Sequence, residues 1–341
     1  MRRSSSLAWF SIVSVLIGAA ACNTPAVGPR DMGAGGDAGV GGDAGPRVIT
    51  LPAATTGPQG SPGVPVVASC VGMAMAPAPG AAVSFTLNLL SFGTSGDHAP
   101  NTKVCFCGNN TFAAEALSVM PGTSCGTGCQ LVTTDASGHA TVMGRANGWY
   151  AYRVFASNPP GPTFGTTFLD SIQVNEPTPS MAGATSDANA ISSLIAMTVA
   201  EAELIPRLAG TTTFAGRVRD CHGDNVQGAI VRAYHADGTE ILDGGLMVSL
   251  PHYRFFSGDG MTPASDVTNT QADGLFVVLN VPPASHGELV RLEAWAFTGT
   301  GATGTATRIG CEAAQAFPDG LSIVNLGPTR SDYPAGHPCH P

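Results

Sequence analysis

Glycine and proline interrupt this chain so often that long regular helices have little room. The 341 residues include 44 glycines and 26 prolines, which favour turns because glycine adopts positive φ and proline lacks a backbone N–H. Only 11% of the residues are charged, and the Glu–Lys pairs that support exposed helices are almost absent. The composition therefore predicts a mostly β fold with many turns.

The start of the chain has the three zones of an export signal. A positive start at Arg2, an apolar stretch over 7–16 and small residues over 18–21 lead directly to Cys22. The apolar stretch is shorter than the ~20 residues that a membrane-spanning helix requires. We therefore expect residues 1–21 to be a signal peptide and not a spanning segment.

The end of this signal resembles the bacterial lipobox, in which a cysteine thiol is acylated and becomes the new N-terminus. Ala19-Ala20-Ala21 followed by Cys22 carries the resemblance, although most lipoboxes have Leu where this chain has Ala19. The resemblance implies a lipid on Cys22 that anchors the exported protein to a membrane. Asn23, rather than Asp, implies the outer membrane, on its periplasmic face or at the cell surface. The alternative is an ordinary cleaved signal followed by an unrelated cysteine.

Residues 22–60 are rich in Gly, Ala, Asp and Pro and have almost no apolar side chains to bury. This composition predicts a disordered tether between the anchor and the folded part. About 280 residues follow the tether, enough for two domains of ordinary size. The remaining chain is predicted to form tandem antiparallel β-sandwiches: domain 1 over 61–185, a connecting helix within 186–210, domain 2 over 211–330 and a tail over 331–341.

Alternating apolar and polar residues predict short strands, over residues 83–89, 103–107, 131–134, 139–142, 149–155, 167–174, 213–220, 229–234, 275–279, 289–295 and 321–326. The strands at 131–134 and 139–142 are expected to form a hairpin around the turn at 135–138. Residues 237–268 are predicted to be a long loop.

Residues 186–205 have a different pattern, and they predict the one helix of the folded part. Apolar residues from Ile191 to Ala202 recur at helical spacing, which is typical of a helix that packs on one face. Ser186 or Asp187 can serve as its N-cap.

The cysteines indicate disulfides. Apart from Cys22 there are eight, an even number that predicts up to four bridges in an oxidising compartment, among Cys70, Cys105, Cys107, Cys125, Cys129, Cys221, Cys311 and Cys339. A metal site is the alternative for the four cysteines between positions 105 and 129, but their spacing matches no common zinc motif. The tail, His337 to His340, also has soft metal ligands. Disulfides are the favoured interpretation for both, and we expect no metal and no cofactor.

The second segment resembles the carboxypeptidase regulatory-like domain, a transthyretin-like β-sandwich. The resemblance covers 211–327 and is carried by Gly216-Arg-Val218-Arg-Asp220, Gly223, Val226, Gly228-Ala229, Val231, Thr270, Asp273-Gly274, Phe276 and Leu279 to Pro282. The first segment resembles it faintly, around 134–138 and 148–154, as a degenerate copy. The resemblance implies an accessory module that carries no catalytic group of its own.

Enzyme signatures are missing or out of context. No His-x-x-Glu occurs for a zinc carboxypeptidase, and no His-x-His for the iron of an intradiol dioxygenase, which remains a remote alternative. The Gly-x-Ser-x-Gly pattern at 122–126 lacks the helix that a nucleophile elbow requires. A self-formed isopeptide bond requires a lysine, and Lys103 is the only one. The net charge of −9 argues against a nucleic-acid partner.

Two non-catalytic functions remain: a lipid-anchored envelope protein that displays interaction or structural modules, or a carbohydrate-binding surface lipoprotein. The expected partners are the membrane and an envelope protein or a polysaccharide. Candidate sugar-stacking residues are aromatic, and because loops often carry binding, we select four residues of the predicted loop as the ligand-binding set: Tyr253, Arg254, Phe255 and Phe256. The other aromatic candidates are Trp149, Tyr150, Tyr152 and Trp295.

Overall fold

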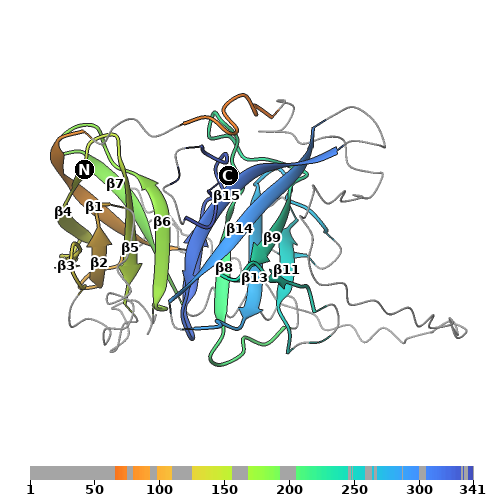
Figure 1. The fold of residues 1–341 in the computed structure, drawn as a ribbon. Helices are drawn as coiled ribbons and strands as arrows, with labels where there is room; N and C mark the ends of the chain where they lie inside the picture. The colour runs from red at the N-terminus through yellow and green to blue at the C-terminus, as the bar shows by residue number, and fades with distance from the viewer. Residues whose placement is uncertain are drawn as a thin grey trace, which may run out of the picture. The chain divides into compact units, whose positions relative to one another are not determined.

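The computed structural model describes residues 66–74, 80–92, 98–109, 125–155, 168–192, 205–244, 247, 249–257, 263–264, 267–285, 287–298, 305–331, 333 and 337–340 (Figure 1). By internal contacts the chain divides into residues 1–47 and 48–341, and every described residue belongs to the second unit. The predicted signal peptide, Cys22 and the predicted tether lie outside the described residues. Within the described ranges the fold is all-β, and no helix there is suited to crossing a membrane.

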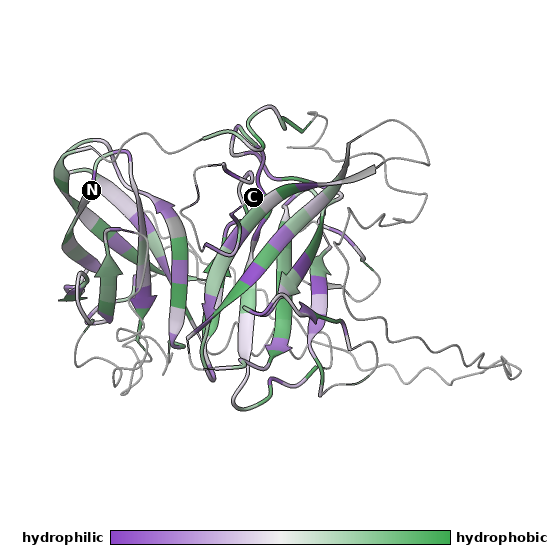
Figure 2. Ribbon diagram, viewed as in Figure 1, coloured by the Kyte–Doolittle hydropathy of each residue, from purple (hydrophilic) through white to green (hydrophobic). Residues whose placement is uncertain are grey.

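The first half of the fold contains seven strands: β1 (Ala82–Phe92), β2 (Lys103–Cys107), β3 (Gln130–Thr133), β4 (His139–Arg145), β5 (Trp149–Val154), β6 (Ser171–Pro177) and β7 (Thr185–Ile191). Strand β1 shows why they form, because Val83, Phe85, Leu87 and Leu89 are buried while the residues between them are not. Side chains alternate between the two faces of a strand, so this period of two buries one face. Figure 2 shows such alternation as bands of hydropathy along the strands.

The second half contains nine strands: β8 (Thr212–Arg217), β9 (Ile230–Tyr234), β10 (Glu240–Ile241), β11 (His252–Phe256), β12 (Pro263–Ala264), β13 (Leu275–Val281), β14 (Glu288–Thr298), β15 (Thr305–Ala316) and β16 (Leu321–Val324). The halves repeat one strand order. The order β4-β1-β7 corresponds to β13-β8-β16, and β6-β5-β2-β3 corresponds to β15-β14-β9-β10. Only β11 and β12 have no counterpart. The domain boundaries themselves stay a prediction.

In each half the first strand pairs in parallel with the last, β1 with β7 and β8 with β16. The predicted all-antiparallel sandwiches are therefore mixed. Gly216 permits the second pairing, because a Cβ at that position would lie 1.8 Å from the carbonyl oxygen of Val324. The glycine of the sequence motif is thus explained by a close backbone approach.

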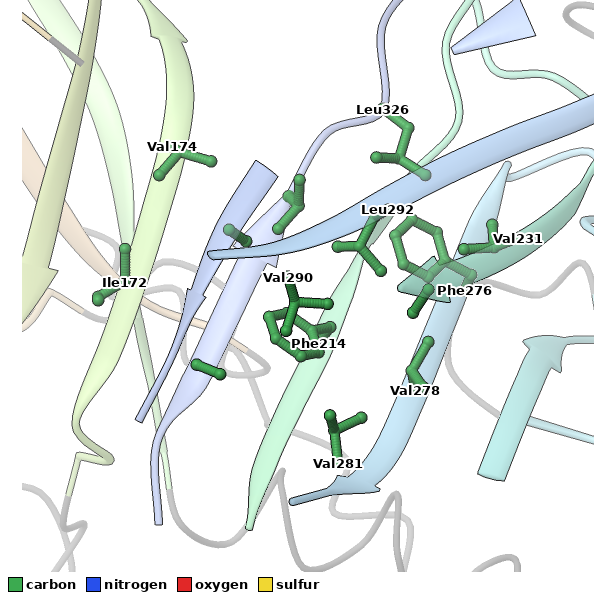
Figure 3. Close-up of a cluster of buried hydrophobic side chains, with 14 of the residues drawn as sticks. Ile172, Val174, Phe214, Val231, Phe276, Val278, Val281, Val290, Leu292 and Leu326 are labelled. Atoms are coloured by element: carbon green, nitrogen blue, oxygen red, sulfur yellow. The ribbon is translucent and has the colours of Figure 1, made fainter. Parts of the chain in front are cut away.

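The halves share one sheet, because β16 also pairs in parallel with β6. The result is a nine-stranded sheet of order β12-β11-β13-β8-β16-β6-β5-β2-β3. One core lies between β4-β1-β7 and the first-half part of this sheet. In the other core, Ile172 and Val174 of β6 belong to the same buried cluster as residues of the second half, including Phe214 and Leu292 (Figure 3).

The predicted connecting helix is wrong where the structure can be compared with it. Thr185–Ile191 form strand β7, with Ala188 and Ala190 buried, and residues 193–204 lie outside the described residues. The local signal misled because the inward side chains of β7 are alanines, which mark a strand only weakly. Pairing with β1, about a hundred residues earlier in the chain, overrides a local pattern of this kind.

The predicted hairpin is also wrong, although its turn is present. The amide of Gly138 donates to the carbonyl of Asp135 at 3.1 Å, and Gly138 has a φ of 79°. Strand β3 nevertheless pairs with β2, and β4 pairs with β1 in the opposite sheet. The turn therefore carries the chain from one sheet to the other.

Candidate interaction surface

The four predicted ligand-binding residues lie in strand β11 and not in a loop. Strand β11 pairs with β13 inside the nine-stranded sheet. Phe255 is only 5% exposed and belongs to the main core of the second half. Phe256 packs on the opposite face, against a small cluster of Ile205, Val277 and Leu279. The two phenylalanine rings therefore fill both sides of the sheet and form no joint exposed platform.

Tyr253 ties three strands together. Its hydroxyl donates to the carbonyl of Ile241 in β10 at 2.5 Å and accepts from the amide of Ala233 in β9 at 3.1 Å. Burial raises the pKa of this hydroxyl. Arg254 donates to the carbonyl of Tyr253 at 2.8 Å and lies 3.7 Å from Asp243. These contacts are structural, and a ligand contact by the four residues stays a prediction.

The exposed apolar side chains of this region lie in the connection between β10 and β11. Leu242 is 67% exposed, Met247 65% and Leu250 42%. We call the described residues 242–244, 247 and 249–251 the apolar loop. The ligand-binding residues predicted from the sequence were chosen around aromatic rings, and they did not include these aliphatic residues. The pair Gly244-Gly245 favours a turn. Leu and Met residues beside such a turn were the sequence signal for exposed apolar side chains.

Hydrogen bonds hold the base of the apolar loop. Asp243 accepts from the amide of Tyr253 at 3.0 Å, and the amide of Gly244 donates to the carbonyl of Pro251 at 2.7 Å. His252 places its Nε2 at 3.1 Å from the carbonyl of Met247. The loop therefore presents its apolar side chains from a fixed base.

His252 is the unusual group at this base. It is 1% exposed, and its Nδ1 has no hydrogen-bond partner among the described residues. Oδ1 of Asp243 lies 3.9 Å from this nitrogen. Burial lowers the pKa of His252, with a further decrease from Arg254 and an opposing effect of Asp243. The neutral imidazole is thus the form that the fold favours.

The eight cysteines that follow Cys22 are all paired, as predicted. The four bridges are Cys70–Cys221, Cys105–Cys125, Cys107–Cys129 and Cys311–Cys339. The last one fixes the tail, where the Tyr333 hydroxyl donates to the carbonyl of Cys311 at 2.7 Å and its ring stacks on His337 at 4.3 Å.

The first bridge belongs to a segment that we call the strap, residues 66–74. The strap precedes the first half in sequence but is bound to the second half. The amide of Val67 donates to Asp220 at 3.0 Å, the amide of Cys221 donates to the carbonyl of Val67 at 3.0 Å, and Gly72 donates to Thr329 at 2.7 Å. The described chain therefore starts in contact with the second half, continues through the strands of the first half, and then forms the second half.

Most of the other aromatic candidates are buried or hydrogen-bonded within the fold. Tyr150 and Tyr152 are 0% and 1% exposed, and Tyr152 donates to Gln173 at 2.5 Å. The indole N–H of Trp295 donates to Glu293 at 3.0 Å. Trp149, at 36%, is the most exposed of these candidates. Lys103 is exposed on β2.

Comparison with known proteins gives only distant similarity. No protein-family model and no curated protein matches the sequence. Among solved structures, the Bacillus anthracis TIE protein is 10% identical, with 72% of this chain and 34% of that chain covered and a TM-score of 0.22. A streptococcal ancillary pilin is 12% identical, with coverages of 72% and 62% and a TM-score of 0.18. The shaft pilin SpaA of Lactobacillus rhamnosus GG is 13% identical, with coverages of 72% and 97% and a TM-score of 0.19.

This chain thus spans about a third of the first of these proteins and less than two thirds of the second. TM-scores this low carry no functional argument. The architecture rests on the strand pairings themselves.

Proposed function

We propose that this protein is a non-catalytic, lipid-anchored component of the bacterial cell envelope whose β-sandwich frame displays an interaction surface. The apolar loop is that surface, and an envelope protein or a polysaccharide is its partner. Lipid on Cys22 holds the protein at the outer membrane. The export signal and the lipobox-like Ala19 to Cys22 support this location.

The exposure of Leu242, Met247 and Leu250 is the observation that carries the proposal. Large aliphatic side chains gathered on one loop are typical of a surface that a partner covers. Fully burying each of them contributes about 1.5–3 kcal/mol, and each 1.4 kcal/mol is tenfold in affinity. Burial of these three side chains by a partner therefore makes a measurable contribution to affinity.

The loop is tested by affinity capture from an envelope extract and on a glycan array. The variant Leu242→Ser/Met247→Ser/Leu250→Ser is expected to lose capture at least about tenfold. The control Leu131→Ser/Met143→Ser removes two side chains of the first half that are 40% and 45% exposed, and it should capture as the wild type does. Equal capture by all three proteins contradicts the proposal. Binding confined to the glycan array assigns the surface to a carbohydrate.

The anchor is tested separately by membrane fractionation and mass spectrometry of the intact protein. Cys22→Ser should move the protein from the membrane to the soluble fraction, and the acyl mass should disappear. Retention of the variant in the membrane contradicts lipid anchoring but leaves the role of the apolar loop intact.

A further inference from the structure

Four of the eight cysteines bring their sulfur atoms to one place. Cys105 and Cys107 alternate on β2, so both project from the same face of the sheet, and both are 0% exposed. The Sγ atoms of Cys105, Cys107 and Cys129 lie within 4.8 Å of one another, and Cys125 is bonded to Cys105. We call Cys105, Cys107, Cys125 and Cys129 the sulfur quartet.

The spacing of the sulfur quartet suits a soft metal ion. A tetrahedral zinc site has Zn–S distances of about 2.3 Å, which places its sulfurs about 3.8 Å apart. The separations among Cys105, Cys107 and Cys129, all within 4.8 Å, are close to this geometry, and Cys125 joins them through its bond to Cys105. No other group of three or more possible ligands among the described residues meets this criterion, so bridges such as Cys70–Cys221 do not share the property.

The surroundings of the sulfur quartet also suit a charged thiolate site. Burial excludes competing water, since Cys125 is only 4% exposed and Cys129 is partly buried. Arg153 is the cross-strand partner of Cys105, and paired residues of neighbouring strands share a face. Its guanidinium forms an ion pair with Asp170, so charged groups are already accommodated on this side of the sheet.

We propose that the sulfur quartet is a site with two chemical states: two disulfides when oxidised, and one bound zinc-class divalent ion when reduced. A dithiol reductant supplies two electrons and two protons to each disulfide and is itself oxidised to a disulfide. The ion then coordinates four thiolates, and the four thiol protons pass to solvent. A newly made chain has free thiols and reaches the metal-bound state without a reductant.

The test uses the full chain. It is reduced with a dithiol under anaerobic conditions, the reductant is removed, and the protein is titrated with Co²⁺. Cobalt reports a tetrathiolate site through its sulfur-to-metal charge-transfer absorption, and Zn²⁺ should displace it. The reduced wild type is expected to bind one ion with this spectrum. The variant Cys105→Ser/Cys107→Ser should lose the spectrum.

The matched control is Cys70→Ser/Cys221→Ser/Cys311→Ser/Cys339→Ser, which keeps only the sulfur quartet. Reduction already breaks all four bridges, so these substitutions remove no further crosslink from the reduced chain. One Co²⁺ per chain with the tetrathiolate spectrum is expected. Because metal binding couples to folding, Zn²⁺ should also raise the melting temperature of this variant, or restore its circular dichroism if reduction unfolds it.

Three results overturn the proposal. One is a quartet-only variant that shows neither the absorption nor any response of its fold to Zn²⁺. The second is an unchanged spectrum in Cys105→Ser/Cys107→Ser. The third is equal Co²⁺ binding by the oxidised wild type, which would place the metal elsewhere.

Discussion

Arg153 joins the two halves through one buried charge. It is 3% exposed, and its guanidinium donates to both oxygens of Asp170, at 2.7 and 2.5 Å. The guanidinium also lies 5.0 Å from the ring centre of Phe155 and 5.3 Å from that of Phe317. Phe317 follows β15, so an arginine of the first half is held between rings of both halves.

Replacing Asp170 should therefore be costly. Asp170→Asn keeps the shape but removes the carboxylate that the buried guanidinium binds through two nitrogens, and we expect a loss of about 3 kcal/mol in the free energy of unfolding. Denaturant unfolding measures it. The control Asp187→Asn changes an exposed carboxylate that binds Asn88 at 2.8 Å, and it should cost less than about 1 kcal/mol. Equal effects of the two variants would show that the charge of Asp170 is not needed.

His252 predicts a dependence of stability on pH. The fold lowers the pKa of His252 below its ordinary value of 6.5, so the unfolded chain takes up the proton first. The contribution of His252 to stability is therefore complete above the ordinary value and is lost as pH falls below 6.5 toward the folded-state pKa. Unfolding measured at about pH 7.5 and pH 5 should show a smaller acid-induced loss in His252→Asn than in the wild type. Equal losses would exclude His252 as the source.

Strand β11 illustrates how one element can separate stability from binding. Its rings are internal, whereas the exposed side chains precede it in the apolar loop. Tyr253→Phe removes a donor to Ile241 and an acceptor for Ala233, so we expect unfolding to become easier by about 1–3 kcal/mol. Capture of the partner should be unchanged. The serine variant of the apolar loop should behave in the opposite way, with stability within about 0.5 kcal/mol of the wild type.

Local patterns predicted several strands whose inward side chains are large, although they placed β11 in a loop. Strand β2 begins and ends where the sequence predicts. All of its residues after Lys103 are buried, and Val104 and Phe106 lie on one face. Strand β15 was not predicted, because several of its inward positions are small residues such as Ala314 and Ala316. The presence of disulfides among the eight cysteines was predicted from their even number and an oxidising compartment. Which cysteine pairs with which depends on the tertiary structure.

The candidate site could be predicted only in part. The segment between β9 and β13 was predicted to be a long loop that carries binding, and the apolar loop lies within it. Which side chains point outward depends on pairing between β11 and β13, a contact that local sequence does not encode. Sequence reasoning therefore selected Phe255 for its ring, and burial assigned that ring to the core.

At the scale of the whole molecule, the Cys70–Cys221 bridge closes a loop of 151 residues that contains the entire first half. In the chain-entropy description, such a loop contributes up to about 5 kcal/mol by restricting the unfolded state, against about 3.6 kcal/mol for a loop of 28 residues, the separation of Cys311 and Cys339. Cys70→Ser/Cys221→Ser should therefore destabilise more than Cys311→Ser/Cys339→Ser in denaturant unfolding. The reverse order would show that local packing outweighs loop length.

The strap also determines how the molecule responds to mechanical tension. A pull applied on the N-terminal side of the strap meets the second half at Cys221 before it reaches any strand of the first half. While the bridge is intact, the chain between its cysteines, which are 151 positions apart, cannot extend, and about 500 Å of contour length is withheld. In single-molecule stretching, that length should appear only after a reductant is added. Tension applied between the strap and the second half should therefore bypass the strands of the first half for as long as the bridge is intact.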